Sequence, residues 1–177
     1  MRKTNILPWT DKWAKSYELE ANKLKQIFRD EIIEIFHIGS TSIPTIGYAK
    51  PIIDILIVVK EIDKVDFYNE KMRLEGYEPK GEYGIEGRRY FPKSNNEHTQ
   101  HRTHHVHIFQ VGHGAIKGHL NFKEYLLLHP KRAKAYGDLK IALAKQFPDN
   151  HYDYQEGKQE FVEELVKEAR DWAKKIK

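Results

Sequence analysis

Periodic hydrophobic residues mark the first helix of the chain. Over about residues 11–29 they recur at three- and four-residue steps opposite a charged face, and this spacing predicts an amphipathic helix. The residues of the buried face are Trp13, Tyr17, Ala21, Leu24 and Phe28. A segment rich in β-branched residues follows at about 32–38, and it predicts a strand that leads into Gly39 and Ser40.

A second hydrophobic run, residues 52–59, is interrupted by a single charged residue, Asp54. Its length and composition predict a buried strand. Between the two strands, Pro44, Gly47 and Pro51 predict an irregular passage with room for a turn of helix. Burying a lone carboxylate costs several kcal/mol unless it is paired or hydrogen-bonded. Asp54 is therefore the first candidate for a functional role.

The middle of the chain mixes short elements with polar connections. We expect a helix at about 62–74, then a hairpin formed by strands at 77–83 and 88–91, with glycines around its turn. Residues 92–102 are polar without periodicity, and they predict a mobile loop over a site. The alternation in 103–111 predicts a further strand.

Helical periodicity dominates from about residue 115 onward. One helix stops before Pro130, a second begins there and ends near Phe147, and a third begins near Asn150. Strands followed by a run of helices predict an α+β fold, with a mixed β-sheet, flanking helices and a helical C-terminal part.

Length and composition bound the class of protein. The chain has 177 residues, which suits one domain over 1–177, with a sheet-containing core at about 10–112 and a helical part at about 113–177. Hydrophobic residues make up 40% and charged residues 32%, as in globular proteins. No hydrophobic run approaches the roughly 20 residues that span a bilayer, and the N-terminus has no segment like a signal peptide. We expect a cytoplasmic protein with no membrane partner.

The charge and the residue types narrow the candidate chemistry further. A net charge of +4 suits anionic small molecules. The basic residues are spread along the chain, which argues against dedicated nucleic-acid binding. The chain has no cysteine, so any metal must be held by histidine, aspartate or glutamate.

The small residues Gly39, Ser40 and Thr41 follow a predicted strand, where a turn can offer backbone N–H groups and hydroxyls to a phosphate. The chain contains no GxxxxGK[ST] or GxGxxG motif, and a plain structural turn is the other interpretation. Asp54 has two interpretations as well. If the two strands are neighbours, Asp54 lies beside the turn and suits a hard cation such as Mg²⁺; otherwise it makes a buried structural hydrogen bond.

Histidines supply the second group of candidates. His105 and His107 share one face of their strand, where they suit Zn²⁺ or Mn²⁺, acid–base chemistry, or polar contacts around an anion pocket. Three more, His98, His101 and His104, fall in or beside the polar loop, where solvation is expected.

Basic side chains near these positions are candidates for binding phosphate. Arg88 and Arg89 are neighbours on a strand, so one should point into the site and the other into solvent. Lys50 precedes the Asp54 strand, where it either balances a triphosphate or lies on the surface.

Several longer stretches together resemble the GrpB family, over nearly the whole chain. They are "HIGSTSIP…AKPIIDILIVV", "GRRYFPK", "RTHHVHIF", "HLNFKEYLLLHP" and "AYGDLKIALAKQFPDN". The resemblance implies a nucleotidyltransferase-like fold, because that family belongs to the nucleotidyltransferase superfamily. The superfamily pattern is a strand, a Gly-Ser turn, a strand with two carboxylates separated by one residue, and a third carboxylate on a later strand.

Carried onto this chain, the resemblance places the first metal-binding carboxylate at Asp54 and the second position at Leu56, which cannot bind a metal. The later strand offers His105 and His107 in place of the third carboxylate. The predicted catalytic residues are Asp54 and His107, and the predicted metal ligands are Asp54, His105 and His107. The predicted phosphate-binding residues are Gly39, Ser40, Thr41, Lys50, Arg88 and Arg89.

The function implied by the resemblance is an enzyme that binds a nucleoside triphosphate with a divalent metal, Mg²⁺, Mn²⁺ or Zn²⁺. It would transfer a nucleotidyl group to an acceptor that the sequence does not identify. Leu56 supports the alternative of a catalytically inactive nucleotide- or CoA-related binding or regulatory module with the same fold. RNA binding rests only on the positive charge and the loop histidines, and it ranks last.

Overall fold

The computed structural model describes residues 4–95 and 101–177, and it divides the chain into two compact units. One, here called the sheet unit, comprises Asp11–Gly39 and Ile52–Ile116. The other, the helical unit, comprises the described residues up to Thr10 together with Ser40–Pro51 and Lys117–Lys177. The expectation of a single domain over residues 1–177 stays a prediction.

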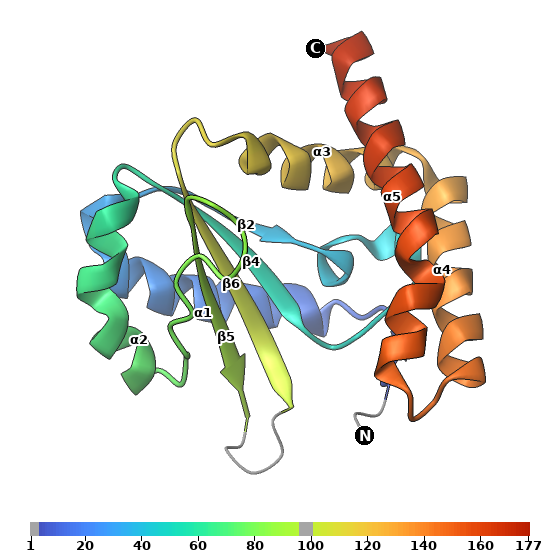
Figure 1. Cartoon of the computed structure of the whole chain (residues 1–177), viewed down its shortest axis with the longest axis horizontal. Helices are drawn as coiled ribbons and strands as arrows, with labels where there is room; N and C mark the ends of the chain where they lie inside the picture. Colours follow the sequence, from blue (N-terminus) through green and yellow to red (C-terminus); the bar gives the residue numbers. More distant parts are fainter. Residues whose placement is uncertain (1–3, 96–100) are drawn as a thin grey trace. The chain divides into compact units, whose positions relative to one another are not determined.

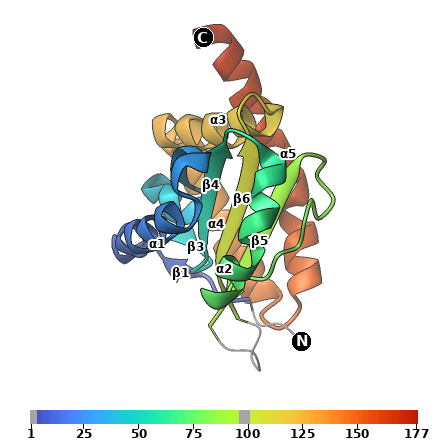
Figure 2. The ribbon, with the colours of Figure 1, turned by 90° about the vertical axis from the view of Figure 1, so that its left-hand side faces the viewer.

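The sheet unit is built on four strands in the order β2-β4-β6-β5. Figure 2 shows β4, β6 and β5 side by side. Their bounds are Ile32–Ile38 for β2, Ile53–Val59 for β4, Arg102–Gln110 for β6 and Arg88–Ser94 for β5. Strand β4 pairs antiparallel with β2 and parallel with β6, and β5 pairs antiparallel with β6. The predicted α+β fold with a mixed sheet is thereby confirmed.

Helix α1, Lys12–Phe28, packs against strands β2 and β4 of this sheet (Figure 1). Trp13, Ala21, Leu24 and Phe28 are buried along its inner face, as the three- and four-residue spacing predicts. Helix α1 thus covers one side of β4, and the other side carries Asp54 together with the buried Leu56 and Val58.

Two predicted elements of the sheet unit differ from the structure. The helix expected at 62–74 is a 3-10 helix, η4 (Ile62–Tyr68), that continues as α2 (Asn69–Leu74). The strand expected at 77–83 is wrong, because the chain turns from residue 81 onward, where Gly81 and Tyr83 adopt positive φ. The segment still hydrogen-bonds to β5, with Lys80 N donating to Tyr90 O at 2.9 Å.

The polar loop expected at 92–102 is also shorter than predicted. Strand β5 continues to Ser94 and β6 begins at Arg102, so the sheet takes up both ends of that segment. His104 lies inside β6 with its side chain mostly buried, so its expected place among solvated loop histidines is wrong. His98 and the rest of 96–100, where the mobile loop was predicted, lie outside the described residues.

The helical unit contains the three predicted C-terminal helices. They are α3 (Gly114–Leu128), which begins just before the unit boundary, α4 (Pro130–Gln146) and α5 (His151–Ile176). The passage at 40–51 folds into two 3-10 turns, η2 (Ser40–Ser42) and η3 (Pro44–Ile46). A short strand β3 (Tyr48–Ala49) follows and pairs with β1 (Leu7–Pro8).

One hydrophobic core holds the helical unit together. It comprises Ile43, Ile46, Tyr125, Leu126, Ala133, Tyr136, Leu165 and Ala169. Helix α4 approaches η3 so closely that a Cβ on Gly137 would overlap the carbonyl oxygen of Ile46. The packing therefore requires a glycine at position 137.

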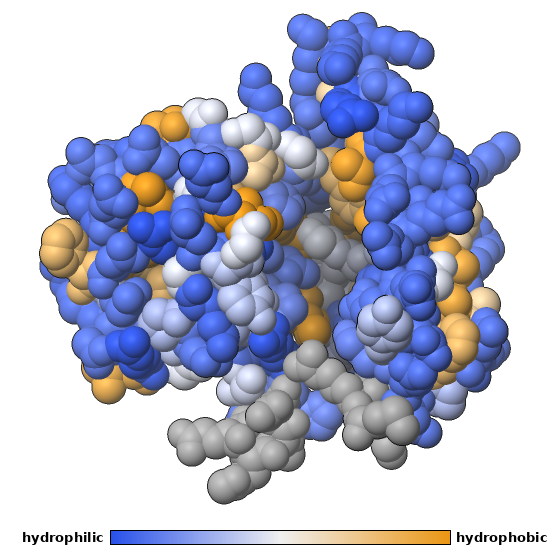
Figure 3. All heavy atoms as spheres, in the orientation of Figure 1, coloured by the Kyte–Doolittle hydropathy of each residue, from blue (hydrophilic) through white to orange (hydrophobic). Residues whose placement is uncertain are grey.

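Polar and charged residues cover most of the face drawn in Figure 3, with hydrophobic residues scattered in small groups among them. Within residues 4–95 and 101–177, no helix has the length and hydrophobicity needed to cross a membrane.

Candidate functional site

Strands β4 and β6 bring Asp54 and two histidines together on one face of the sheet. Their parallel register pairs Asp54 with His105 and Leu56 with His107, and side chains two residues apart share a face. His105 Nδ1 lies 3.3 Å from Asp54 Oδ1, and His107 Nε2 lies 3.5 Å from the same oxygen. The structure thus joins three of the residues that the sequence singles out.

The carboxylate of Asp54 is ionised in this setting. Burial by itself raises its pKa, but the contacts with His105 and His107 lower it by more, so the pKa of Asp54 falls well below its usual value. The isolated carboxylate in a hydrophobic strand is explained by these two partners.

The depressed pKa of Asp54 predicts how the stability of the protein depends on pH. A group with a lowered pKa in the folded state stabilises it at pH values above the pKa of the unfolded chain, about 3.9, and the contribution fades as the pH falls further. We expect Asp54 to contribute on the order of 2 kcal/mol to the free energy of unfolding at pH 7.

Urea unfolding of the wild type and Asp54→Asn between pH 7 and pH 3 checks this expectation. The difference in the free energy of unfolding between them should be largest at pH 7 and should shrink below about pH 4. A difference that stays constant over that range would contradict the assignment.

Arg88 fixes which nitrogen of His107 carries the proton. The guanidinium has only N–H donors, and its Nη1 lies 3.4 Å from His107 Nδ1, so Nδ1 acts as the acceptor. The proton of neutral His107 is then on Nε2, from which it is donated to Asp54. His107 is held as an orienting donor rather than as a free base.

His105 has the opposite tautomer. Its Nδ1 faces Asp54, so in the neutral form of His105 the proton lies on Nδ1 and the lone pair on Nε2. That Nε2 is buried and has no hydrogen-bond partner among residues 4–95 and 101–177. An aspartate that orients the Nδ1–H of a histidine is the arrangement of a general base.

Aromatic and hydrophobic side chains surround this pair. Tyr90 on β5 lies opposite His107 in the sheet, and the centroid of its ring is 5.8 Å from that of His105 and 5.4 Å from that of His107. Leu56, two residues after Asp54 on the same strand, is completely buried. The site therefore has one carboxylate in a largely hydrophobic surrounding.

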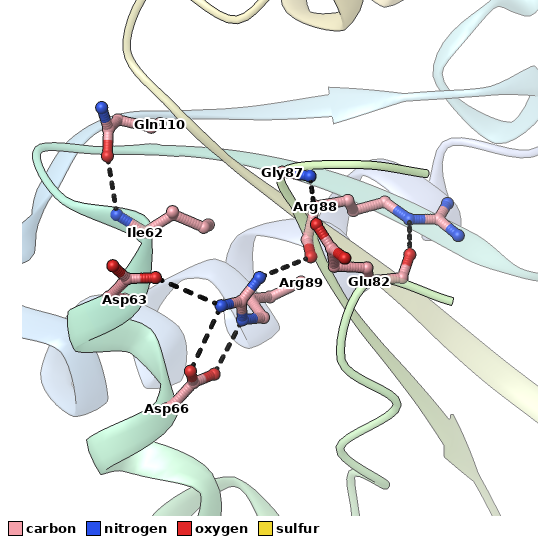
Figure 4. A network of polar contacts seen from close by, with 8 residues as sticks. All are labelled: Ile62, Asp63, Asp66, Glu82, Gly87, Arg88, Arg89 and Gln110. Carbon is pink, nitrogen blue, oxygen red and sulfur yellow. Dashed lines mark hydrogen bonds and ion pairs between the residues drawn. The ribbon is translucent and has the colours of Figure 1, made fainter. Parts of the chain in front are cut away.

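Arg88 and Arg89 point to opposite sides of β5, as alternation along a strand predicts (Figure 4). Arg88 reaches the carbonyl oxygens of Glu82 and Tyr83 as well as His107. Arg89 Nε and Nη2 donate to the carboxylate of Asp66 at 2.7 and 3.2 Å. Arg88 lies on the same face of the sheet as Asp54, whereas Arg89 forms its ion pair with Asp66 on the other side.

The residues around Asp54 do not fit a metal centre as they are arranged. Imidazole and carboxylate are suitable ligand types for a transition metal, but Nε2 of His107 carries a proton and Arg88 brings a positive charge beside that ring. Within the described part of the chain, no group of three histidine, aspartate or glutamate side chains is placed to hold an ion. The expected divalent metal stays a prediction.

Gly39 gives the carboxylate of Asp54 its space. Gly39 has a φ of +72°, and a Cβ at this position would lie 2.5 Å from Asp54 Oδ2. Both the backbone conformation and the close approach therefore require glycine at the end of β2.

Gly39→Ala should lower the free energy of unfolding by about 1–3 kcal/mol, because alanine is strained at positive φ and its methyl group displaces the Asp54 carboxylate. Urea unfolding measures the change. Gly47→Ala is the matched control, since Gly47 also has a positive φ of +83° but nothing lies within 4 Å of its would-be Cβ. Equal losses for the two variants would show that the contact with Asp54 does not matter.

Ser40 begins the helical unit, and its hydroxyl is hydrogen-bonded to the ammonium group of Lys140 on α4. Lys140 is buried, with 4% of its surface exposed, and its Nζ lies 4.3 Å from the centroid of the Tyr136 ring. Sequence reasoning missed this lysine. The sequence feature that could have identified Lys140 is its position on the buried face of the helix, in register with Ala133, Tyr136 and Leu143. A hydrophobic residue is expected at that position.

The other predicted phosphate-binding residues lie elsewhere in the helical unit. Lys50 Nζ is 3.3 Å from His151 Nδ1 and 4.6 Å from the centroid of the Tyr154 ring, so it lies against α5. Thr41 is buried, and its carbonyl oxygen accepts a hydrogen bond from Trp9 Nε1. The roles predicted for these residues stay predictions, and Lys140 is the cation that contacts Ser40.

The mixed sheet and the aspartate–histidine site on its face define an α+β protein with a candidate acid–base centre. The family model described as GrpB protein matches residues 3–168. The chain belongs to the GrpB family, and the predicted membership is confirmed.

Two similar proteins cover almost all of the chain. The UPF0157 protein YqkA of Bacillus subtilis (strain 168) is 48% identical over 173 residues, which are 98% of this chain and 49% of YqkA, so the chain spans about half the length of this relative. The crystal structure of conserved protein GrpB from Enterococcus faecalis is 41% identical, with a TM-score of 0.87, and the match covers 95% of this chain and 99% of that one.

A slight similarity extends to solved structures of Cid1. The structure of Cid1 in complex with the UTP analogue UMPNPP has a TM-score of 0.43 and 15% identity, over 85% of this chain and 46% of Cid1.

Proposed function

We propose that the protein binds a nucleoside triphosphate and transfers its nucleotidyl group to an acceptor hydroxyl, with His105 as the general base. The observation that carries this proposal is the pairing of His105 Nδ1 with Asp54, beside a ring nitrogen, Nε2, that has no hydrogen-bond partner among residues 4–95 and 101–177. The reaction class comes from the family pattern of a Gly-Ser turn followed by a strand with a carboxylate, which Gly39, Ser40 and Asp54 reproduce.

In the proposed reaction, the oxygen of the acceptor hydroxyl attacks the α-phosphorus of the nucleotide. His105 Nε2 takes the proton of that hydroxyl at the same time. The bond from the α-phosphorus to the bridging oxygen breaks, and pyrophosphate leaves. Asp54 stabilises the imidazolium that forms on His105, and His107 holds Asp54 in place. A positioned general base of this kind typically accelerates a reaction by about 10²- to 10⁴-fold.

Within the helical unit, taken by itself, Ser40 and Lys140 offer a candidate contact for phosphate. A hydroxyl and an ammonium group in direct contact are donors of the kind that phosphate oxygens accept. The ammonium of Lys140 is held at low exposure, which strengthens its attraction for an anion.

A panel of nucleoside triphosphates tests the proposal. Binding would be followed by calorimetry and turnover by pyrophosphate release, each with Mg²⁺, Mn²⁺ or Zn²⁺ and with a chelator. We expect at least one nucleotide to bind and to release pyrophosphate in the presence of an acceptor. If no nucleotide binds under any of these conditions, the proposal is wrong. A strict requirement for one ion in binding or in turnover would restore the metal to the mechanism.

The alternative is a nucleotide- or CoA-related binding module without catalysis. Leu56 favours it, because a completely buried leucine occupies the place of the second family carboxylate. The same panel separates the two functions. Binding without pyrophosphate release, with every acceptor offered, would support the module and remove the transferase.

A further inference from the structure

Tyr83 is held in a conformation that its residue type disfavours. Its φ is +47°, and Arg29 is the other non-glycine residue with positive φ in the described part of the chain. Such a conformation costs a non-glycine residue about 1–2 kcal/mol in other proteins, and it persists where surrounding contacts impose it. Yet 56% of Tyr83 is exposed, so its ring does not have the burial that usually explains a tyrosine.

Specific contacts impose this conformation on residues 82–87, here called the Tyr83 loop. Arg88 donates from Nη2 to Tyr83 O at 2.8 Å and from Nε to Glu82 O at 3.2 Å. Gly87 N donates to Glu82 Oε2 at 2.5 Å (Figure 4). The arginine that fixes the tautomer of His107 therefore also fixes the backbone that presents Tyr83.

The ring of Tyr83 continues the aromatic side of the site toward solvent. It stacks on Tyr90 with 5.3 Å between ring centroids and 17° between planes. Tyr90 in turn contacts the rings of His105 and His107, which bind Asp54. Tyr83 is thus one aromatic ring away from the candidate base.

A charged group, the ammonium of Lys80, lies beside the Tyr83 ring. Its Nζ lies 5.8 Å from the ring centroid and 2.7 Å from Glu78 Oε1. Surface ion pairs of this kind contribute little to stability, so an incoming planar group can displace the lysine at small cost.

We propose that Tyr83 binds the nucleobase of the substrate by stacking, as a binding residue of the same site. This inference rests on the proposed function, and it names the part of the ligand that the Tyr83 loop recognises. An exposed aromatic ring fixed beside a catalytic centre offers a flat surface on which any base can stack. A base–aromatic stack is typically worth about 5- to 100-fold in affinity.

The test compares a nucleoside triphosphate with inorganic tripolyphosphate, which has the phosphates but no base. Calorimetry would measure both affinities for the wild type, Tyr83→Ala and Tyr83→Phe. We expect Tyr83→Ala to weaken nucleotide binding by about 5- to 100-fold and tripolyphosphate binding by less than about twofold. Tyr83→Phe keeps the ring and should stay within about twofold for both. Tyr152→Ala, at another exposed tyrosine (73%), is the matched control.

The outcomes separate the inference from the proposed function. If the wild type binds nucleotide and Tyr83→Ala binds it equally well, or loses both ligands alike, the stacking role is wrong and the proposed function stands. If the wild type binds neither ligand, both are wrong. Tyr83→Gly adds a second readout, because glycine relieves the positive φ: the midpoint of thermal unfolding should not fall, while nucleotide affinity should. A lower midpoint would show that Tyr83 serves the fold instead.

Discussion

Asp54→Asn will still fold, and it will lower nucleotidyl transfer by about 10³- to 10⁴-fold. One oxygen of the carboxylate contacts both His105 Nδ1 and His107 Nε2, and the neutral amide of asparagine cannot stabilise an imidazolium on His105. His105 would then lose its preferred tautomer and its charge partner. Pyrophosphate release under the conditions that work for the wild type measures the loss, and thermal unfolding shows that the variant is folded.

Two histidine variants identify the base within the same experiment. His105→Asn keeps a donor near the place of Nδ1 but has nothing at the place of Nε2, so its turnover should fall about as far as that of Asp54→Asn. His107→Gln keeps a donor at the place of Nε2 and should lose less than about tenfold. The reverse order would make His107 the base, as the sequence predicts. Unchanged turnover in all three variants would show that Asp54, His105 and His107 do not form an acid–base centre.

Gly137→Ala should destabilise the helical unit by at least about 3 kcal/mol. The added Cβ would overlap the carbonyl oxygen of Ile46, and a backbone atom cannot move aside as the tip of a side chain can. Either α4 or the turn at η3 must shift, and both belong to the main core of the unit.

Gly118→Ala is the matched control for Gly137→Ala. Gly118 lies in helix α3 of the same unit, and nothing lies within 4 Å of its would-be Cβ. This alanine should raise the free energy of unfolding by up to about 1 kcal/mol, because it lowers the entropy of the unfolded chain. Urea unfolding followed by circular dichroism compares the two variants. A loss below about 1 kcal/mol for Gly137→Ala would mean that α4 and η3 do not approach each other as closely as described.

The strands and long helices follow from sequence patterns because each pattern reflects which side of an element is buried. The alternation in β6 places His105 and His107 on one face, and the hydrophobic run around Asp54 identifies the strand beside it. The segment at 77–83 differs from its predicted strand because Gly81 and Tyr83 within it have positive φ, which turns the chain. A pattern of side chains does not report backbone conformation.

The site could be predicted only in part, since its chemistry depends on contacts between distant residues. The proximity of Asp54 to the histidines follows from strand pairing. The tautomer of His107 depends on its contact with Arg88, a residue that the sequence predicts only as a phosphate ligand. Lys140 and Ser40 are 100 residues apart in the sequence, and no local sequence pattern predicts their contact. Lys50 was the nearer lysine in sequence, and the structure places it against α5.

The way in which the two units share the chain has a consequence for synthesis. Every residue of the sheet unit has left the ribosome once Ile116 is free, whereas the helical unit needs segments from before residue 52 and from after residue 116. Domains fold as units during translation, at about 5–20 residues per second. The sheet with Asp54 and His105 can therefore form first, while Ser40–Pro51 waits for helices α4 and α5, which complete its core.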